Sequence, residues 1–330
     1  MSVIKKYLAS ANSGEGFIQY FDFINDKSKH GYTFILKGSP GSGKSTLMRK
    51  VGEHFYGKGY DVEYFYCSSD ISSLDGVRIP QLNVAVIDGT PPHEREADIP
   101  FIDGKIVSLY GFADGEEISK HKEDIMREWG KKQECFSAAH ALLAAARKTK
   151  DCQKIFEQKN PQEGFHLDNI LAELNLPKLQ KRETPFNRKL FASAVTGEGV
   201  KTIFCEESFK VIHAAQTSQE NIRDLIKRVN ALGYGVTQMM DLLYPYTRCE
   251  KLFIEDADIL ICFSSKTPIS GEEIWTQEKT DELIKKAGSF LEQAKTHHKN
   301  IEKFYSKNTD YEGINKCRQD IIKQIENMKT

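Results

Sequence analysis

A glycine-rich segment at residues 38–45, Gly-Ser-Pro-Gly-Ser-Gly-Lys-Ser, constrains the fold of this chain more than any other feature. It follows residues 32–36, an apolar run typical of a buried strand, and it precedes residues 46–55, which have the apolar spacing of a helix. A strand, a glycine loop and a helix in this order predict an α/β domain with a phosphate-binding loop. The alternative is a glycine-rich turn that holds no ligand.

The residue types of the loop indicate its chemistry. Glycines allow several backbone N–H groups to face one anion, and the start of a helix adds its positive dipole end. Lys44 is expected to reach the β- and γ-phosphates of a nucleoside triphosphate, and Ser45 Oγ to bind Mg²⁺. ATP is the default nucleotide, because the guanine-selecting Asn-Lys-x-Asp pattern is not found. The expected nucleotide-binding residues are Gly38, Ser39, Pro40, Gly41, Ser42, Gly43, Lys44, Ser45 and Thr46.

Composition argues against several classes of protein. The chain has 330 residues, enough for two domains, of which 39% are hydrophobic and 28% charged. A formal net charge of −1 gives no sign of nucleic-acid binding, and no apolar run is long enough to span a bilayer. The seven cysteines are odd in number and lack C-x-x-C spacing, which favours a reducing, cytoplasmic location.

The chain also resembles itself. Residues 5–17 and 188–200 are identical at seven of thirteen positions, and Gly59-Tyr-Asp-Val62 returns as Gly233-Tyr-Gly-Val236. Residues 79–87 then resemble residues 254–262 in pattern. Because the blocks keep the same order, two tandem copies of one unit are predicted.

The second copy is expected to keep the fold without the phosphate site. Residues 209–212 and 222–229 are matched to the strand and helix that flank the first loop. Between them, residues 213–221 form a segment interpreted as two residues shorter, with neither glycine nor lysine. Without glycine, the backbone cannot easily gather its N–H groups on a phosphate.

A fold class and domain boundaries follow from these patterns. We predict an α/β protein with two tandem P-loop NTPase-like domains and mainly parallel sheets, each followed by a helical hairpin, the second domain being degenerate. The first domain is placed at residues 1–157 and the second at residues 188–330. The polar, Pro-containing residues 158–187 are expected to form a linker.

The second magnesium ligand is expected at the end of a neighbouring buried strand. Val84-Ala-Val-Ile-Asp88 has four apolar residues that end in a carboxylate, so Asp88 is the expected metal ligand beside Ser45. The alternative for Asp88 is a turn aspartate. In the second copy Cys262 is near this place.

Hydrolysis would also need a group that orients water, and Gly89 follows Asp88 where many ATPases have a glutamate. His93 and Glu94 are the nearest candidates for a catalytic role beside Lys44, and the alternative is that they only shape the loop.

Two further acidic residues, Asp70 and Asp75, follow the preceding strand on the same expected side of the sheet. Ligands of α/β sheets collect beyond the carboxyl ends of strands, so these residues could meet Mg²⁺ or an acceptor substrate. Capping and turn formation explain Asp70 equally well.

Residues 34–48, 79–88 and 90–94 together resemble a family of bacterial cytosolic tandem P-loop ATPase-like proteins, within the P-loop nucleoside triphosphate hydrolase superfamily. Leu-Phe-Ala-Ser-Ala at residues 190–194 resembles the start of that family's second half. The resemblance covers most of the chain and implies a tandem P-loop fold and ATP binding. The family pattern has a second intact loop, which this chain lacks, and it brings no substrate.

Three functions remain open. The first is a Mg²⁺-dependent ATPase with one active site in the N-terminal half and a nucleotide-free, regulatory second half. The second is a phosphotransferase for a small molecule or nucleoside, favoured by the missing glutamate after Asp88. The third is a non-enzymatic nucleotide-sensing module that presents its second half to a protein partner.

Overall fold

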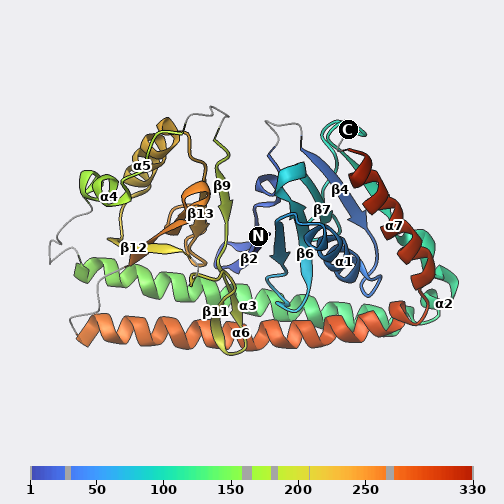
Figure 1. The fold of residues 1–330 in the computed structure, drawn as a ribbon. Coiled ribbons are helices and arrows are strands. Elements are labelled where there is room, and N and C mark those ends of the chain that lie inside the picture. The colour runs from blue at the N-terminus through green and yellow to red at the C-terminus, as the bar shows by residue number, and fades with distance from the viewer. Residues whose placement is uncertain are drawn as a thin grey trace. The chain divides into compact units, whose positions relative to one another are not determined.

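The fold contains a six-stranded and a five-stranded β-sheet, two β-hairpins and two helices of 36 residues, α3 (Lys122–Glu157) and α6 (Gly271–Ser306) (Figure 1). This computed structural model confirms the predicted α/β class. The prediction of mainly parallel sheets is confirmed in part, because both sheets are mixed: three of five strand pairs are parallel in the six-stranded sheet and two of four in the five-stranded sheet. None of the described helices is long and apolar enough to cross a membrane. The structure describes residues 2–26, 31–157, 166–179, 185–207, 209–264 and 271–328, without the side chains of residues 153–157.

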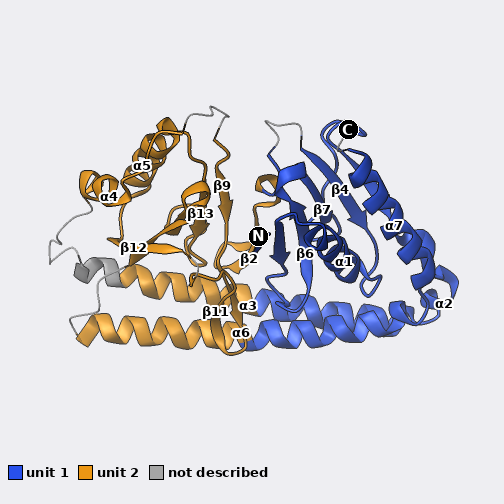
Figure 2. Ribbon diagram, in the orientation of Figure 1, with its two compact units in different colours: residues 1–9, 24–138, 289–330 blue, residues 10–23, 139–288 orange. Residues whose placement is uncertain are grey.

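The chain divides into two compact units, each built from both halves of the sequence (Figure 2). Unit 1 contains residues 1–9, 24–138 and 289–330, and unit 2 contains residues 10–23 and 139–288. These units differ from the predicted domains at residues 1–157 and 188–330, because α3 and α6 each contribute residues to both units.

The predicted linker at residues 158–187 contains a helix, α4 (Leu167–Leu174), which packs on a helix of unit 2, α5 (Gln219–Ala231). Residues 158–165 and 180–184 of that predicted linker lie outside the described residues. The prediction that a helical hairpin follows each sheet is also wrong in detail. A single long helix, α3 or α6, follows each sheet, and the next helix packs against a sheet-flanking helix instead.

Unit 1 has a six-stranded sheet with the strand order β1-β5-β6-β7-β4-β8. Its strands are β1 (Ile4–Tyr7), β4 (Tyr32–Lys37), β5 (Val62–Tyr66), β6 (Leu74–Ile79), β7 (Val84–Asp88) and β8 (Gly104–Ser108). Strand β4 is parallel to both β7 and β8, and β1 is parallel to β5. Strand β6 runs antiparallel between β5 and β7, so the sheet is mixed.

Two helices cover one face of this sheet, α1 (Lys44–Gly57) and α7 (Tyr311–Asn327) (Figure 1). Apolar residues three or four apart on α1 face the sheet, which is the spacing of a helix with one buried side. Burial of each large apolar side chain contributes about 1.5–3 kcal/mol, so this packing fixes α1 and α7 firmly. The core includes Phe34, Leu36, Met48, Val51, Phe55, Val86, Ile314, Ile321 and Ile325.

Unit 2 has a five-stranded mixed sheet with the order β12-β15-β14-β13-β9. Its strands are β9 (Arg188–Leu190), β12 (Lys210–Ala215), β13 (Val236–Met240), β14 (Cys249–Ile254) and β15 (Ile259–Ser264). Helix α5 buries Ile222, Leu225 and Val229. The unit also holds two β-hairpins, β2 (Ser10–Ser13) with β3 (Gly16–Gln19), and β10 (Ser193–Thr196) with β11 (Gly199–Thr202).

The internal repeat of the sequence is visible in strand order and register. The order β9-β13-β14-β15-β12 matches β1-β5-β6-β7-β4, and β8 has no counterpart among the described residues of unit 2. Tyr32 pairs with Val84 as Lys210 pairs with Ile259, which aligns β4 of the first sheet with β12 of the second. Both hairpins close with the same contact, in which the hydroxyl of Ser13 or Thr196 donates to a glycine carbonyl three residues later. The two sheets are therefore copies of one unit.

Candidate functional site

The glycine loop joins strand β4 of unit 1 to helix α1. Strand β4 ends at Lys37 and α1 begins at Lys44, so residues 38–43 form the connection. Parallel pairing of β4 with β7 sets Leu36 opposite Asp88. The loop and Asp88 therefore lie at the same edge of the sheet, beyond the carboxyl ends of parallel strands, where ligands of α/β sheets bind.

The loop depends on glycine at three positions. Gly41 and Gly43 have φ angles of 71° and 80°, a left-handed conformation that other residues rarely adopt. A Cβ atom on Gly38 would lie 2.6 Å from Ser42 Oγ, too close for any other residue without rearrangement. The backbone N–H of Ser42 donates to Ser39 O at 3.2 Å and closes the turn. Glycine is thus required by this backbone and is not only a sign of flexibility.

Several polar groups of the loop have no partner among the described residues. The backbone N–H groups of Gly43, Lys44 and Ser45 make no hydrogen bond there, as expected for the first turn of a helix. Ser39 Oγ and Ser42 Oγ are buried, and within the described part of the chain neither has a hydrogen-bond partner. Buried polar groups are normally satisfied, so donors gathered at a helix N-terminus fit an anionic ligand.

Lys44 is held inside the loop. Its Nζ donates to Gly38 O at 2.7 Å and to Ser39 O at 3.0 Å, and it lies 3.7 Å from Asp88 Oδ2. Asp88 Oδ1 accepts hydrogen bonds from the backbone N–H and the hydroxyl of Thr90, at 2.9 and 2.6 Å. Asp88 therefore does form a turn, as its alternative interpretation expected, while its second oxygen faces Lys44.

The side chain of Ser45 contacts the start of strand β6. Its Oγ accepts the backbone N–H of Leu74, the first residue of β6, at 2.9 Å. A hydroxyl oxygen has two lone pairs, so one remains for a cation. Thr46 is exposed on the first turn of α1.

The structure separates the two candidate catalytic residues that follow Asp88. His93 is buried, and its Nε2 lies 3.4 Å from Asp75 Oδ2. Glu94 is exposed. Burial raises the pKa of Asp75, His93 opposes this rise, and the charge of Asp88 adds to it. His93 and Asp75 thus form a buried pair near Asp88 that can hold a proton.

Two neighbours complete this edge of the sheet. Burial raises the pKa of the Cys67 thiol well above its usual value, and Asp75 adds to the rise, so Cys67 is held as an unreactive thiol. Asp70 accepts hydrogen bonds from Ser72 and forms an ion pair with Lys295 at 3.1 Å. Asp70 therefore caps a turn, which was the alternative expected for it.

Two residues of the C-terminal helices also contact the loop, and sequence reasoning missed both. Tyr311 Oη donates to Gly41 O at 2.8 Å, across 270 residues of sequence. The backbone of Glu302 lies beside Gly41, since a Cβ atom on that glycine would be 3.0 Å from Glu302 O. A hydrogen bond from His298 lowers the pKa of Glu302, burial opposes this, and the charge of Lys44 lowers it further. No local sequence pattern signals such contacts.

In unit 2, the connection between β12 and α5 differs in position and length from our expectation for the second copy. Strand β12 spans Lys210–Ala215, so Ala215 corresponds to Lys37, and the match of residues 209–212 to the first strand was displaced. Only residues 216–218 separate β12 from α5, against residues 38–43 in the first copy. Ten residues lie between Lys37 and Met48 but six between Ala215 and Ile222, so the second connection is four residues shorter, not two.

A capped helix replaces the glycine loop in unit 2. The Ser218 hydroxyl accepts the backbone N–H of Asn221 at 3.3 Å and caps α5. The residue equivalent to Asp88 is Phe263, not Cys262, because Phe263 pairs with Ala214 as Asp88 pairs with Leu36. The buried ring of Phe263 cannot bind a cation. The position of Asp75 is taken by Glu250.

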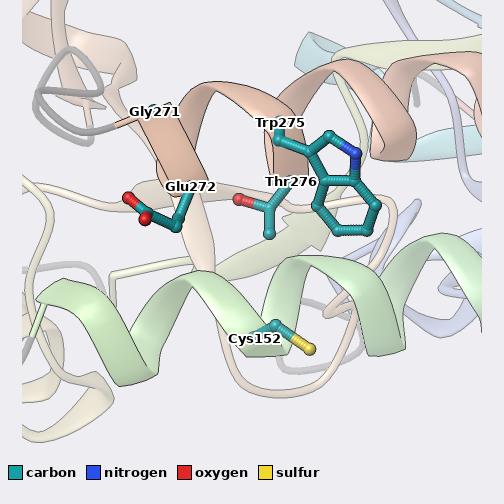
Figure 3. A pocket seen from close by; sticks show the side chains of 5 residues that line it. All are labelled: Cys152, Gly271, Glu272, Trp275 and Thr276. Carbon is teal, nitrogen blue, oxygen red and sulfur yellow. The ribbon is translucent and has the colours of Figure 1, made fainter.

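Unit 2 also has a surface pocket of about 420 Å³ between α3 and α6 (Figure 3). Cys152 of α3 faces Trp275 and Thr276 of α6 across it. Gly271 and Glu272 complete the lining. The pocket brings together none of the residues expected from the sequence to bind nucleotide.

Comparison with known proteins gives one partial likeness. A family model described as "Nephrocystin 3, N-terminal" matches residues 12–78. The matched segment contains the glycine loop, ends before Asp88 and covers 67 of the 330 residues, so the chain is similar to that family there without being shown to belong to it. No curated protein and no solved structure matches the chain. The resemblance to bacterial tandem P-loop ATPase-like proteins therefore stays a prediction.

Glu250, the counterpart of Asp75 in unit 2, is expected to make the free energy of unfolding depend on pH. Burial raises the pKa of Glu250 to about 7, with Asp241 adding to the rise, and Lys251, Lys150 and Arg248 opposing it. The folded chain therefore binds this proton more tightly than the unfolded chain does. The stability that this group contributes is complete below the ordinary glutamate pKa and is lost as pH rises through about 7.

We expect the free energy of unfolding to fall by up to about 3 kcal/mol between about pH 5 and pH 8 because of Glu250. Denaturant unfolding of the wild type and of Glu250→Gln across this range measures the effect, and the variant should lose that part of the pH dependence. Glu220→Gln, at an exposed position of α5, is the control. An unchanged pH profile in Glu250→Gln would contradict the assignment.

Proposed function

We propose that this chain binds a nucleoside triphosphate with Mg²⁺ at residues 38–46 and hydrolyses it, as an ATPase with one active site. The observation that carries the proposal is the glycine loop between β4 and α1, where the N–H groups of Gly43, Lys44 and Ser45 have no hydrogen bond with a described residue. Lys44 and Asp88 lie beside those groups. This combination of donors, cation and carboxylate suits the phosphates and metal of MgATP.

The loop residues would hold the phosphates. Gly38, Gly41 and Gly43 let the backbone approach them closely, and Ser39 and Ser42 offer two hydroxyl groups that are free of partners among the described residues. Lys44 Nζ bonds to two loop carbonyls, so its charge is already directed into the loop. Exchange of these carbonyls for phosphate oxygens would replace neutral acceptors with charged ones, which make stronger hydrogen bonds.

Ser45 and Asp88 are the residues that would hold Mg²⁺. The described residues contain no group of three or more His, Cys, Asp or Glu that could bind a metal alone. Mg²⁺ commonly binds through one or two protein ligands together with phosphate oxygens and water, so a two-residue site fits this ion. The bound metal would neutralise charge that develops on the phosphates.

His93 is the residue best placed to accept a proton from water. It is buried beside Asp75, which can hold the ring in one orientation. Glu94 is exposed and makes a weaker candidate. Gly89 follows Asp88, so the glutamate that many ATPases have at that point is missing. The same absence supports our second candidate, a phosphotransferase in which an acceptor hydroxyl takes the place of water.

Substitution of Lys44 tests nucleotide binding. Lys44→Ala should weaken binding of MgATP by about 10- to 100-fold, because a charge-assisted contact to phosphate is lost. Isothermal titration with a non-hydrolysable ATP analogue and Mg²⁺ measures this affinity. Lys50→Ala, on the exposed side of the same helix, should bind as the wild type does. Equal affinity in the wild type and Lys44→Ala would overturn the site.

A second pair of variants tests the route of proton transfer. His93→Asn should lower the rate of phosphate release by about 10²-fold or more while nucleotide affinity stays near that of the wild type. Glu94→Gln should leave both quantities nearly unchanged, because Glu94 is exposed. Free phosphate and ADP are measured with and without candidate acceptors. Tight ATP binding without turnover would refute the ATPase, and ADP formed only with an acceptor would establish the phosphotransferase.

A further inference from the structure

The end of α6 and the first residue of α7 lie against the glycine loop within unit 1. Tyr311 Oη donates to Gly41 O at 2.8 Å, and two ring carbons of Tyr311 would be 3.6 and 3.7 Å from a Cβ on Gly43. The Cα atom of Glu302 would be 3.5 Å from a Cβ on Gly41. The two left-handed glycines of the loop thus face residues near the end of the chain, which form a further wall of the candidate site.

This wall is held in place by contacts that do not involve the loop. Helix α7 packs on α1 through a buried apolar core. The backbone N–H of Asp310 donates to Phe112 O at 2.7 Å, and the N–H of Asp114 donates to Asn308 O at 2.8 Å. The Asp310 side chain also caps the first turn of α7. Tyr311 therefore reaches the loop from a fixed backbone.

Tyr311 fixes one peptide group of the loop. The peptide between Gly41 and Ser42 has its carbonyl bonded to Tyr311 and its N–H bonded to Ser39 O. With both ends held, the peptide cannot rotate, and the N–H groups of Gly43 and Lys44 that follow keep their direction. A binding site whose donors are fixed in advance loses less entropy when its ligand arrives.

We propose that Tyr311 is a positioning residue of the nucleotide site, and that the C-terminal helices of the second repeat complete the phosphate loop of the first. The inference rests on the proposed function. By this inference, the second repeat contributes to the nucleotide site of the first repeat and needs no bound nucleotide of its own. Its last helix, α7, belongs to unit 1, whereas α4, the last helix of the first repeat, belongs to unit 2.

The proposal requires coupling in both directions. If Tyr311 strengthens nucleotide binding, a bound nucleotide must stabilise the contact between Tyr311 and the loop by the same free energy. Residues 308–314 should then exchange their amide hydrogens more slowly with MgATP present. A purely structural role of Tyr311 would give no nucleotide-dependent protection there.

Tyr311→Phe tests the hydrogen bond while it keeps the ring. Affinity for a non-hydrolysable ATP analogue with Mg²⁺ should fall by about 3- to 10-fold, the effect of one lost hydrogen bond, with the melting temperature of the free protein nearly unchanged. Tyr311→Ala should lose more. Tyr56→Phe is the matched control, since Tyr56 has similar exposure, 40% against 42%, but lies at the other end of α1.

The results separate this inference from the proposed function. Absence of nucleotide binding by the wild-type chain would overturn the proposed function. Wild-type binding that is retained unchanged in Tyr311→Phe and Tyr311→Ala would overturn only the role of Tyr311. Reduced affinity in both variants, together with loss of the nucleotide-dependent protection of residues 308–314, is the result expected here.

Discussion

Parallel pairing of β4 with β7 is the constraint on which the rest of the candidate site depends. It sets Leu36 opposite Asp88, so the loop that follows β4 begins beside a carboxylate. The antiparallel strand β6 lies on the other side of β7 and brings Asp75 to the same edge. Helix α1 can begin there only because Gly41 and Gly43 turn the chain through left-handed conformations. The buried apolar face of α1 then fixes the direction of its first N–H groups.

The two sheets show how one fold carries a glycine loop in one copy and a short capped connection in the other. The order and register of the matching strands are the same, so the difference lies in the connection that follows β4 in one sheet and β12 in the other. A connection four residues shorter leaves no length for the loop, and Ser218 satisfies the helix end that a phosphate would otherwise occupy. Phe263 takes the place of Asp88, so the second copy has no carboxylate at this position. The second repeat keeps its own sheet and contributes α7 to unit 1.

Local patterns in the sequence predicted the glycine loop, the helix after it, the strand that ends at Asp88 and the internal repeat. Strand β6 was missed because Asp75 and Arg78 interrupt its apolar pattern, although both side chains are buried. Strand β12 was misplaced because an apolar pattern alone does not set register, which comes from pairing with β15. The contact of Tyr311 and the exchange of helices between units depend on tertiary packing, which leaves no local signal.

We propose that the glycine loop of unit 1 binds a nucleoside triphosphate and that the equivalent connection of unit 2, residues 216–218, does not. Native mass spectrometry of the intact protein with Mg²⁺ and a non-hydrolysable ATP analogue counts bound nucleotides most directly. We predict a single nucleotide per chain, because Gln216, Thr217 and Ser218 form the whole connection in unit 2 and include no glycine or lysine. Two bound nucleotides per chain, or none, would contradict it.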